Sequence, residues 1–386
     1  MLSGMQLLNT VSYREVHWGP LIMALILTGI GLAMVVSATL DPMDPGNWGS
    51  EARMQLLWWA LSLSTCLFCL HVPPATWNAL ALPIAFAALG LQLFVLVAAG
   101  SAIVPYINGQ ANWIVLGPLR LQPGEFVKIA CLLSVAKVAS ESRCDLREIG
   151  WVAVVCLIWL APIVLLAKED LGTALPLIPM LIGILFLGGA RLRVIASICA
   201  SGLVMASAGI AVILSGNSYM ARRVWAWLRP EEYLLTEAFQ VQRALRSIGS
   251  GQWFGKGYGL GDQNLLGWVP EKHTDMIFSV IGEELGFIGS SLVILLFFAF
   301  GLVGLWATLA ARDRFGRLFI GGFTCMIMAQ VAINLTVVLG LMPVTGITLP
   351  FFSYGGSSLL ATYIGIGICC SCSTGKTHHF SRRQLE

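Results

Sequence analysis

Three carboxylates gather where a long apolar segment begins, and the first question is what chemistry they could do there. Asp275 is followed by Glu283 and Glu284, and the apolar run from Leu285 to Ala310 is long enough to cross a bilayer alone. An ionisable side chain at the edge of a membrane is costly to bury and therefore marks a candidate functional site. A carboxylate there can take a proton from a hydroxyl. The alternative is a structural ion pair, with Lys272 or an arginine of the same loop as partner.

Two further polar clusters lie near the outer ends of other apolar segments. Glu125 and Lys128 are three residues apart at the start of a short apolar segment, so a helix would place both on one face. A local salt bridge is the alternative to a functional role, and burying one is expensive. Asn334 precedes the segment 340–360, whose proline, glycine and hydroxyl residues, Ser353 among them, form a rigid turn. Together the three clusters predict one polar cavity on the outer side of a membrane.

The long polar segment 215–275 carries a large share of the charge in the chain. Arg222 and Arg223 are followed by alternating tryptophans, a pattern typical of a short helix in the headgroup layer, and both an interfacial anchor and a phosphate-binding role fit it. A glycine-rich run around Lys256 comes next. It lacks the spacing of a phosphate-binding loop, which argues against a nucleotide site. Its backbone can take positive φ and approach a ligand or another backbone closely.

These residues must be positioned by a chain that is apolar almost throughout. Hydrophobic residues make up 57% of its 386 positions and the mean hydropathy is +0.81, which excludes an ordinary soluble domain. We therefore predict an all-α polytopic membrane protein, one integral membrane domain over 1–386, with a long outer loop, 215–275, between its seventh and eighth spans. The ten predicted spans are 19–40, 54–72, 77–99, 126–139, 149–167, 171–189, 193–214, 276–310, 318–341 and 356–372.

Basic residues in the short loops predict the orientation of these spans. They concentrate in the loops after the fourth, sixth and eighth spans and in the C-terminal tail, which places both termini on the cytoplasmic side. None of the ten cysteines falls in a predicted outer loop, so no disulfide framework is expected. The net charge of +3 is too small to indicate a nucleic-acid partner, whereas membrane lipids are an obligatory one.

Five sequence segments resemble the SEDS family, the polytopic proteins of bacterial cell-wall synthesis that act in shape, elongation, division and sporulation. The segments extend over most of the chain, and the last two are long enough to be highly specific. They are NGQANWIVLGPLRLQPGEFVKIA (108–130), KEDLGTAL (168–175), IGSGQWFGKGYGLGDQ (248–263), VPEKHTDMIFSVIGEELGFIG (269–289) and GLMPVTGITLPFFSYGGSSLL (340–360).

The resemblance implies a peptidoglycan glycosyltransferase of the bacterial cytoplasmic membrane. Such an enzyme polymerises lipid II, the undecaprenyl-pyrophosphate disaccharide-pentapeptide, into glycan strands beside a class B penicillin-binding protein, a transpeptidase. By position, Asp275 matches the essential acidic residue of the family. Glu125 and Lys128 match its Glu/Lys pair, and Trp113 matches an aromatic residue after a glycine-rich outer turn. The short N-terminus and the lack of extra domains favour the elongation, rod-shape type over the cell-division type.

Five positions depart from the family pattern. Gly124 replaces a serine, Asn112 a basic residue and Phe239 a tyrosine, while Arg243 and Ala244 replace a Gln-Ser pair. One cation is thereby lost at 112 and one is gained at 243. The departures change how a pyrophosphate would be held and leave the acidic residue and the Glu/Lys pair untouched.

The implied reaction is the attack of a sugar 4-hydroxyl on the anomeric carbon of a lipid-linked sugar, from which a pyrophosphate leaves. Our hypothesis makes Asp275 the general base. Basic side chains, or a divalent cation such as Mg²⁺ or Mn²⁺ for which no ligand set stands out, would bind the pyrophosphate. The residues expected to bind substrate or line the site are Glu125, Lys128, Trp113, Arg222, Arg223, Arg243, Arg246, Lys256, Glu283 and Ser353.

Two other classes of function account for parts of the pattern. A flippase for lipid II would need polar residues along a path at mid-membrane depth, whereas here they concentrate on the outer side. A non-catalytic scaffold for the transpeptidase would leave Asp275 and the Glu125/Lys128 pair without a task, so replacing them would be harmless. The distribution of polar residues favours the externally facing enzyme.

Overall fold

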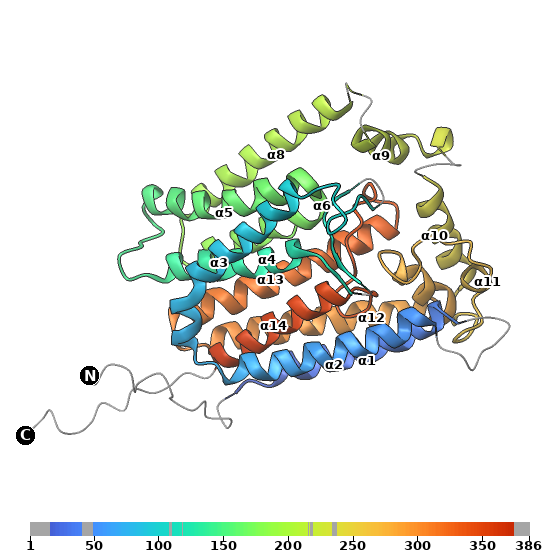
Figure 1. The fold of residues 1–386 in the computed structure, drawn as a ribbon, viewed down its shortest axis with the longest axis horizontal. Helices are drawn as coiled ribbons and strands as arrows, with labels where there is room; N and C mark the ends of the chain where they lie inside the picture. Colours follow the sequence, from blue (N-terminus) through green and yellow to red (C-terminus); the bar gives the residue numbers. More distant parts are fainter. Residues whose placement is uncertain are drawn as a thin grey trace, which may run out of the picture.

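The computed structural model describes residues 16–40, 49–107, 110–117, 119–214, 216, 219–233 and 238–373. Its long helices run roughly along one axis, and shorter elements gather at one end (Figure 1). The apolar runs form helices because a backbone in a bilayer must satisfy its own hydrogen bonds. These helices are α1 (Gly19–Ala38), α2 (Ser50–His71), α3 (Pro74–Val97), α4 (Pro123–Ser140), α5 (Ile149–Glu169), α6 (Leu171–Ala174), α7 (Leu177–Leu187), α8 (Leu192–Leu214), α12 (Ile277–Ala310), α13 (Arg314–Val338) and α14 (Gly356–Ser373).

All ten predicted spans fall on helices, and the prediction of an all-α polytopic fold is confirmed. Within the described residues, eight helices are long and apolar enough to cross a membrane. The sixth predicted span is divided into α6 and α7 at Pro176, which has no amide proton to donate to a continuous helix. The fourth, predicted over 126–139, begins earlier at Pro123 and so includes Glu125 and Lys128 in its first two turns.

The centre of the bundle is formed by α4, α13 and α14, whose side chains are largely buried. α14 packs against α2, α4 against α3, and α13 against α7 and α12. Glycine permits a close approach of α14 to α2, since a Cβ on Gly367 would lie 2.5 Å from the Cys66 carbonyl oxygen. α8 lies along one edge of the bundle in Figure 1 and buries only Ile195 among its residues.

The loops segregate to the two ends of the bundle, as alternating spans require. At one end the His17 amide donates to Ser373 Oγ (3.1 Å), so the two ends of the described chain meet. Arg314 donates to the Cys144 carbonyl (3.1 Å), which joins two of the basic loops. The opposite end carries the shorter elements and the three polar clusters. The cytoplasmic location of the first end stays a prediction.

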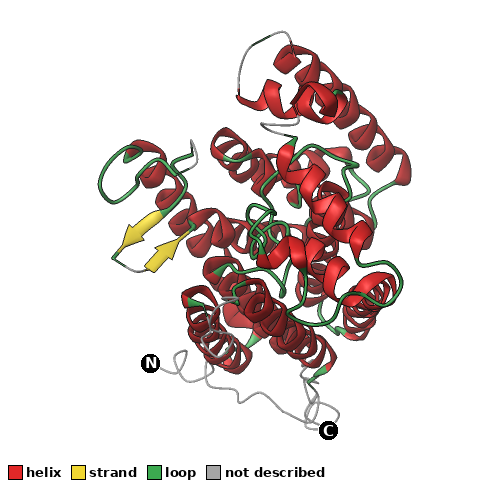
Figure 2. Cartoon of the chain, turned by 90° about the vertical axis from the view of Figure 1, so that its right-hand side faces the viewer, coloured by secondary structure: helices red, strands yellow, loops and turns green. Residues whose placement is uncertain are grey.

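The predicted outer loops contain secondary structure of their own. β1 (Ile114–Leu116) pairs antiparallel with β2 (Leu119–Leu121), with Ile114 opposite Leu121, and the hairpin stands at the rim of this end in Figure 2. The segment after α8 is largely helical. Its elements are α9 (Tyr219–Leu228), η3 (Pro230–Tyr233), α10 (Phe239–Ser250) and α11 (Asp262–Leu265).

The glycine-rich run after α10 docks against a break in α12. Gly286 interrupts that helix with φ 66° and ψ −166°, and the Phe287 amide donates to the Gln252 carbonyl at 2.7 Å. A Cβ on Gly255, whose φ is +79°, would lie 2.1 Å from the Glu284 carbonyl oxygen. At Gly255 the glycine therefore serves the close approach of two backbones, one of the two uses left open by the sequence.

Candidate active site

Asp275 lies in the loop before α12, and its side chain is buried with 7% exposed. Gln240 on α10 donates through Nε2 to both carboxylate oxygens, at 3.3 Å and 3.4 Å. Asn334 on α13 donates through Nδ2 to the Asp275 carbonyl at 2.8 Å. Two helices thus hold the residue, and within the described part of the chain its carboxylate has no ion-pair partner.

The shape of the loop before α12 depends on Glu271, whose φ of 51° lies in the left-handed region. Its carbonyl accepts hydrogen bonds from the amides of Thr274 (3.1 Å) and Met276 (3.2 Å), which closes a tight turn. A non-glycine residue in this conformation costs on the order of 1–3 kcal/mol, and such strain clusters at functional sites. The turn places the exposed Glu271 carboxylate near Asp275.

The pKa of Asp275 is raised to about 6. Burial is the main cause and the Glu271 carboxylate the second, while hydrogen bonds from the backbone, Thr274 and Gln240 oppose the shift. The carboxylate is therefore mostly ionised at neutral pH, yet more basic than an ordinary aspartate. A group with those two properties is suited to general base catalysis.

The turn between α13 and α14 supports the Asp275 loop from the side of the bundle core. Ser353 Oγ donates to the Thr274 carbonyl (2.5 Å), and the Tyr354 amide donates to the His273 carbonyl (2.7 Å). Gln55 on α2 donates to the Ser353 carbonyl (3.1 Å). Ser353, predicted to line the site, thus contacts the backbone next to Asp275.

Glu125 and Lys128 form a buried ion pair of 2.9 Å at the start of α4. Lys128 Nζ also donates to Gln330 Oε1 on α13 (3.2 Å), and Gln330 Nε2 donates to the Thr348 carbonyl (3.2 Å). One helical turn further along α13, Asn334 donates to the Ile347 carbonyl as well as to Asp275. The three predicted clusters are therefore connected by hydrogen bonds through α13 and the turn that follows it.

Lys256 and Glu283, two further predicted site residues, bind each other at 2.7 Å. Lys256 also pairs with Asp262 at 3.0 Å. Glu283 is fully buried and accepts additional hydrogen bonds from Ser247 Oγ (2.9 Å) and the Gln263 amide (3.0 Å). These contacts fasten α10 and the glycine-rich run to α12.

The predicted arginines lie on α9 and α10. The Arg243 guanidinium lies over the rings of Phe239 (5.1 Å) and Trp268 (5.2 Å). Arg222 and Arg246 are exposed. Arg223 is half-buried and donates to the Val344 carbonyl at 3.2 Å, so its guanidinium is engaged with the turn after α13.

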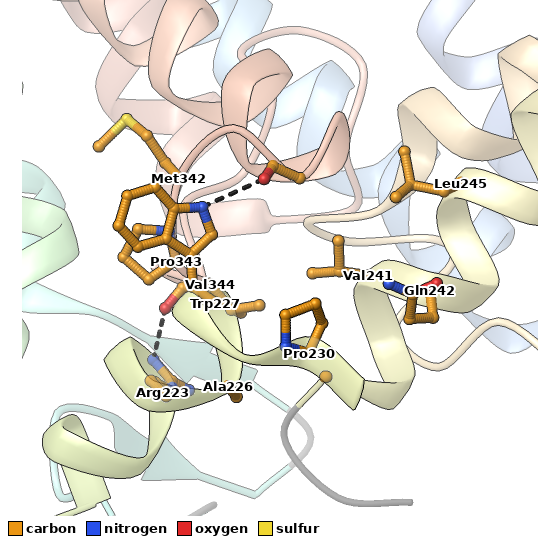
Figure 3. Close-up of a pocket in the computed structure, with 12 residues that line it drawn as sticks. Arg223, Ala226, Trp227, Pro230, Val241, Gln242, Leu245, Met342, Pro343 and Val344 are labelled. Atoms are coloured by element: carbon orange, nitrogen blue, oxygen red, sulfur yellow. Dashed lines mark hydrogen bonds between the residues drawn. The ribbon is translucent and has the colours of Figure 1, made fainter. Parts of the chain in front are cut away.

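A cavity of about 80 Å³ lies between α9, α10 and the turn after α13 (Figure 3). Arg223 lines it, Trp227 donates to the Gly340 carbonyl (3.1 Å) beside it, and Gln242 lines it from α10. Its walls are otherwise mainly apolar, and Asp275 is not among its lining residues. The hydrogen bonds of Arg223 and Trp227 fasten α9 to the bundle.

Three of the departures from the family pattern lie in close-packed or buried surroundings. A Cβ on Gly124 would lie 3.0 Å from Leu166 Cδ2, so a larger residue needs that side chain to shift. Asn112 is buried and donates to Gln110 Oε1 (3.3 Å), beside the half-buried Trp113. Ala244 is fully buried on α10.

Three residues of the site were missed by the sequence analysis, namely Gln55, Gln330 and Gln240. Gln55 and Gln330 are amides inside apolar helices, and that rarity was a usable signal. Gln240 stands among other polar residues of an amphipathic helix, so no sequence pattern distinguishes it.

The described residues contain no group of three or more His, Cys, Asp or Glu side chains arranged to hold a metal ion. Around Asp275 the neighbours are amides, hydroxyls and one exposed carboxylate. These residues do not fit a dedicated Mg²⁺ or Mn²⁺ site, and no step of the mechanism below uses one.

Comparison with known proteins identifies the family to which this chain belongs. The family model FtsW/RodA/SpoVE, described as cell cycle protein, matches residues 18–378. The chain belongs to this family. Stage V sporulation protein E of Bacillus subtilis (strain 168) is 36% identical to this SEDS protein over 359 residues, 91% of this chain and 95% of that protein. The SEDS resemblance of the motifs is therefore confirmed.

Two further similarities bear on function. The "Probable peptidoglycan glycosyltransferase FtsW" of Trichlorobacter lovleyi is 34% identical over 360 residues, 92% of each chain. A similar chain occurs in the solved structure "Structural coordination of polymerization and crosslinking by a peptidoglycan synthase complex". The two chains are 30% identical and superpose with a TM-score of 0.76, and the match covers 92% of this chain and 97% of that one. The similar proteins include a stage V sporulation protein E, proteins named FtsW and a rod shape determining protein RodA of Thermus thermophilus, so they do not resolve the subtype.

Proposed function

We propose that this chain is a peptidoglycan glycosyltransferase that polymerises lipid II at the outer face of the bacterial cytoplasmic membrane. The observation that carries the proposal is the state of Asp275, a buried carboxylate with a pKa of about 6 and no ion-pair partner in the described residues. It lies at the end of the bundle opposite the basic loops. Membership of a family that includes proteins named as peptidoglycan glycosyltransferases supports the proposal.

In the proposed mechanism Asp275 acts as general base. Its carboxylate takes the proton of the acceptor 4-hydroxyl as that oxygen forms a bond to the anomeric carbon of the donor sugar. The bond between the anomeric carbon and the pyrophosphate oxygen breaks, and its electron pair leaves with the pyrophosphate. A correctly placed base of this kind contributes about 10²- to 10⁴-fold to the rate.

Positive charge for the departing pyrophosphate comes from α9 and α10. Arg222 and Arg246 present exposed guanidinium groups, and Arg243 lies one turn from Gln240 on α10. Arginine matches phosphate oxygens with paired donors, which suits it to this task. The ammonium group of Lys256 is already shared between Glu283 and Asp262 and is expected to contribute less.

Glu125 and Lys128 act on the site through the framework rather than on the reacting atoms. Lys128 reaches the turn after α13 through Gln330, and Asn334 on the same helix holds the Asp275 backbone. The buried ion pair lies within α4, and the hydrogen bond from Lys128 to Gln330 connects α4 to α13. Trp113 and Ser353 line the same outer end.

The proposed partner is a class B penicillin-binding protein, and the proposed orientation places both termini in the cytoplasm. The similar solved chain comes from a structure named as a peptidoglycan synthase complex, which supports an assembly of this kind. The orientation is supported by the basic loops at the end of the bundle where the described chain starts and stops. An elongation rather than a division role remains a prediction, because the relatives do not resolve the subtype.

The flippase alternative fits the structure less well. The buried charged side chains of the described residues all belong to the outer end, and none lies at the end where His17 meets Ser373. They are Glu125, Lys128, Asp275, Glu283 and Glu284. A path for a charged headgroup across the whole bilayer would need polar residues along its full depth.

The decisive experiment is polymerisation of labelled lipid II by the purified protein, co-expressed with its transpeptidase. The wild type is compared with Asp275→Asn in the presence of moenomycin, which silences contaminating conventional transglycosylases. Polymer from the wild type and none from a folded Asp275→Asn protein establishes the enzyme and its base. Equal amounts of polymer from both proteins would exclude Asp275 as the general base. No polymer from either would favour the flippase alternative, which a lipid II translocation assay tests.

A further inference from the structure

The Asp275 carboxylate has two side-chain donors, and they are not equivalent. Thr274 Oγ1 carries one proton but lies near three acceptors: the Glu271 carbonyl (3.1 Å), Glu271 Oε2 (3.0 Å) and Asp275 Oδ1 (3.3 Å). Since a hydroxyl donates one hydrogen bond at a time, the two shorter contacts to Glu271 compete with Asp275. The amide of Gln240 has two protons, and Nε2 reaches both oxygens of Asp275.

Gln240 stands on a helix that is fixed to α12 independently of Asp275. Gln240, Ala244 and Ser247 recur along one face of α10. Ser247 Oγ lies 3.2 Å from the Ser279 carbonyl and 2.9 Å from Glu283 Oε2. Ala244, between the two polar residues, is fully buried and has no side-chain donor. On this face of α10 Gln240 is therefore the side chain that serves Asp275.

We propose that Gln240 is the positioning residue of Asp275, and that its amide both holds the carboxylate toward the acceptor hydroxyl and stabilises its ionised form through the two hydrogen bonds. The inference rests on the proposed role of Asp275 as general base. A glutamine suits this role because its amide orients a carboxylate and stays neutral across the working pH range. A lysine or arginine in its place would make the carboxylate too weak a base.

The electrostatic surroundings of Asp275 make its titration a readout of this contact. Glu271 in the same loop is the ionisable neighbour that acts on it. α13 presents the neutral Asn334 and the turn after α13 the neutral Ser353. Arg243 on α10 is held over two aromatic rings. The remaining ionisable groups of the adjoining elements have other partners: Lys272 with the Asn264 carbonyl, His273 with the Tyr354 ring, Glu283 with Lys256, and Glu284 with Ser37.

The test compares pH profiles of lipid II polymerisation by the full chain in complex with its transpeptidase. Gln240→Leu removes the amide and keeps a similar volume. We expect the acid limb of its profile, the low-pH range in which the rate rises with pH, to shift to higher pH by roughly half to one unit. Activity near pH 6 then falls several-fold and recovers toward pH 8. Gln240→Glu places a second carboxylate beside the first and moves the limb further. Gln242→Leu, which faces the cavity of Figure 3, is the matched control and keeps the wild-type limb.

Two results would overturn the inference: a Gln240→Leu acid limb that superimposes on the wild type, or an equal loss of activity at every pH. Asp275→Asn in the same assay separates this inference from the mechanism on which it rests. If that variant is inactive while Gln240→Leu is unshifted, only the role of Gln240 fails. If Asp275→Asn is active, the general base itself fails. Should Gln240→Leu not fold, Gln240→Asn keeps the amide on a shorter stem and is expected to shift the limb in the same direction.

Discussion

Asp275 and Glu283 are two buried carboxylates at the N-terminal end of α12, and their surroundings differ in kind. Glu283 accepts hydrogen bonds from Lys256 (2.7 Å), Ser247 (2.9 Å) and the Gln263 amide (3.0 Å). Asp275 is served by long contacts of 3.3–3.4 Å from Gln240 and competes with Glu271 for Thr274. One carboxylate is saturated by strong donors, and the other is not.

The difference shows that burial alone does not separate a functional carboxylate from a structural one. Charge-assisted hydrogen bonds offset the cost of burying Glu283 and commit its oxygens to α10 and the glycine-rich run. Glu284, next in sequence, is similarly engaged by Ser37 Oγ (2.6 Å) and Asn264 Nδ2 (3.0 Å). Of the three carboxylates, Asp275 has the longest side-chain hydrogen bonds.

The largest expected effect separates activity from stability at Asp275. Asp275→Asn is expected to lower polymerisation by at least about 10²-fold, because the proton acceptor is gone. Its thermal stability at neutral pH should be unchanged or higher, since the ionised carboxylate is held in a site that disfavours charge. Polymer yield per folded protein and thermal unfolding in detergent measure the two. If Asp275→Asn is destabilised but keeps its activity, Asp275 is a structural carboxylate rather than a functional one.

The next largest effect is expected where the glycine-rich run meets α12. Gly255→Ala adds a Cβ 2.1 Å from the Glu284 carbonyl oxygen at a φ of +79°, and should destabilise the fold by at least about 2 kcal/mol. Gly249→Ala is the matched control, because a Cβ there meets nothing within 4 Å and the residue lies within α10. Thermal unfolding of both variants checks the contrast, and equal unfolding temperatures would contradict it.

Glu283→Gln is expected to cost about 1–3 kcal/mol of stability, because it removes the charge that binds Lys256 inside the bundle. Polymerisation per folded molecule should fall much less than in Asp275→Asn. The measurement pairs unfolding temperature with polymer yield for the two variants. If Glu283→Gln abolishes polymerisation in a protein as stable as the wild type, Glu283 belongs to the chemistry and the comparison fails.

The smallest effect sharpens the comparison without any mutation. Because the pKa of Asp275 is raised to about 6, the wild-type rate should climb about tenfold per pH unit below that value and level off above it. The contribution of Asp275 to stability depends on pH in the opposite direction. The folded state binds this proton more tightly than the unfolded chain, so the contribution of Asp275 to stability is present below about pH 4 and lost as the pH rises to about 6. A rate that is flat from pH 5 to 8 would contradict a base with this pKa.

Much of the framework was predictable from local sequence. Continuous apolar runs predicted helices, and all ten predicted segments are helical, since a bilayer accepts few alternatives to a helix. The i to i+3 spacing of Glu125 and Lys128 predicted that they share a face, and the ion pair stated as the alternative to a functional role is present. The break at Gly286 also lies beside Leu285, where the sequence started the membrane-crossing part of α12.

Contacts between distant segments were not predictable in the same way. The sequence could not tell that the glycine-rich run docks on α12, that Lys256 binds Glu283, or that Gln240 serves Asp275. These pairs are separated by many residues, and their side chains have several possible partners at the same end of the bundle. Which partners meet depends on how α10 packs, and no periodicity in the sequence records that.

The sequence by itself determined that this is a helical membrane protein of the SEDS type with its charged residues at one end, because hydropathy and long motifs are local properties. Only the tertiary structure decided which partners each carboxylate at that end has. Lys256 and two serines engage Glu283, whereas Asp275 meets a neutral amide and keeps a raised pKa. Burial and donor geometry set the basicity of a carboxylate, and both depend on the packing of segments far apart in the chain.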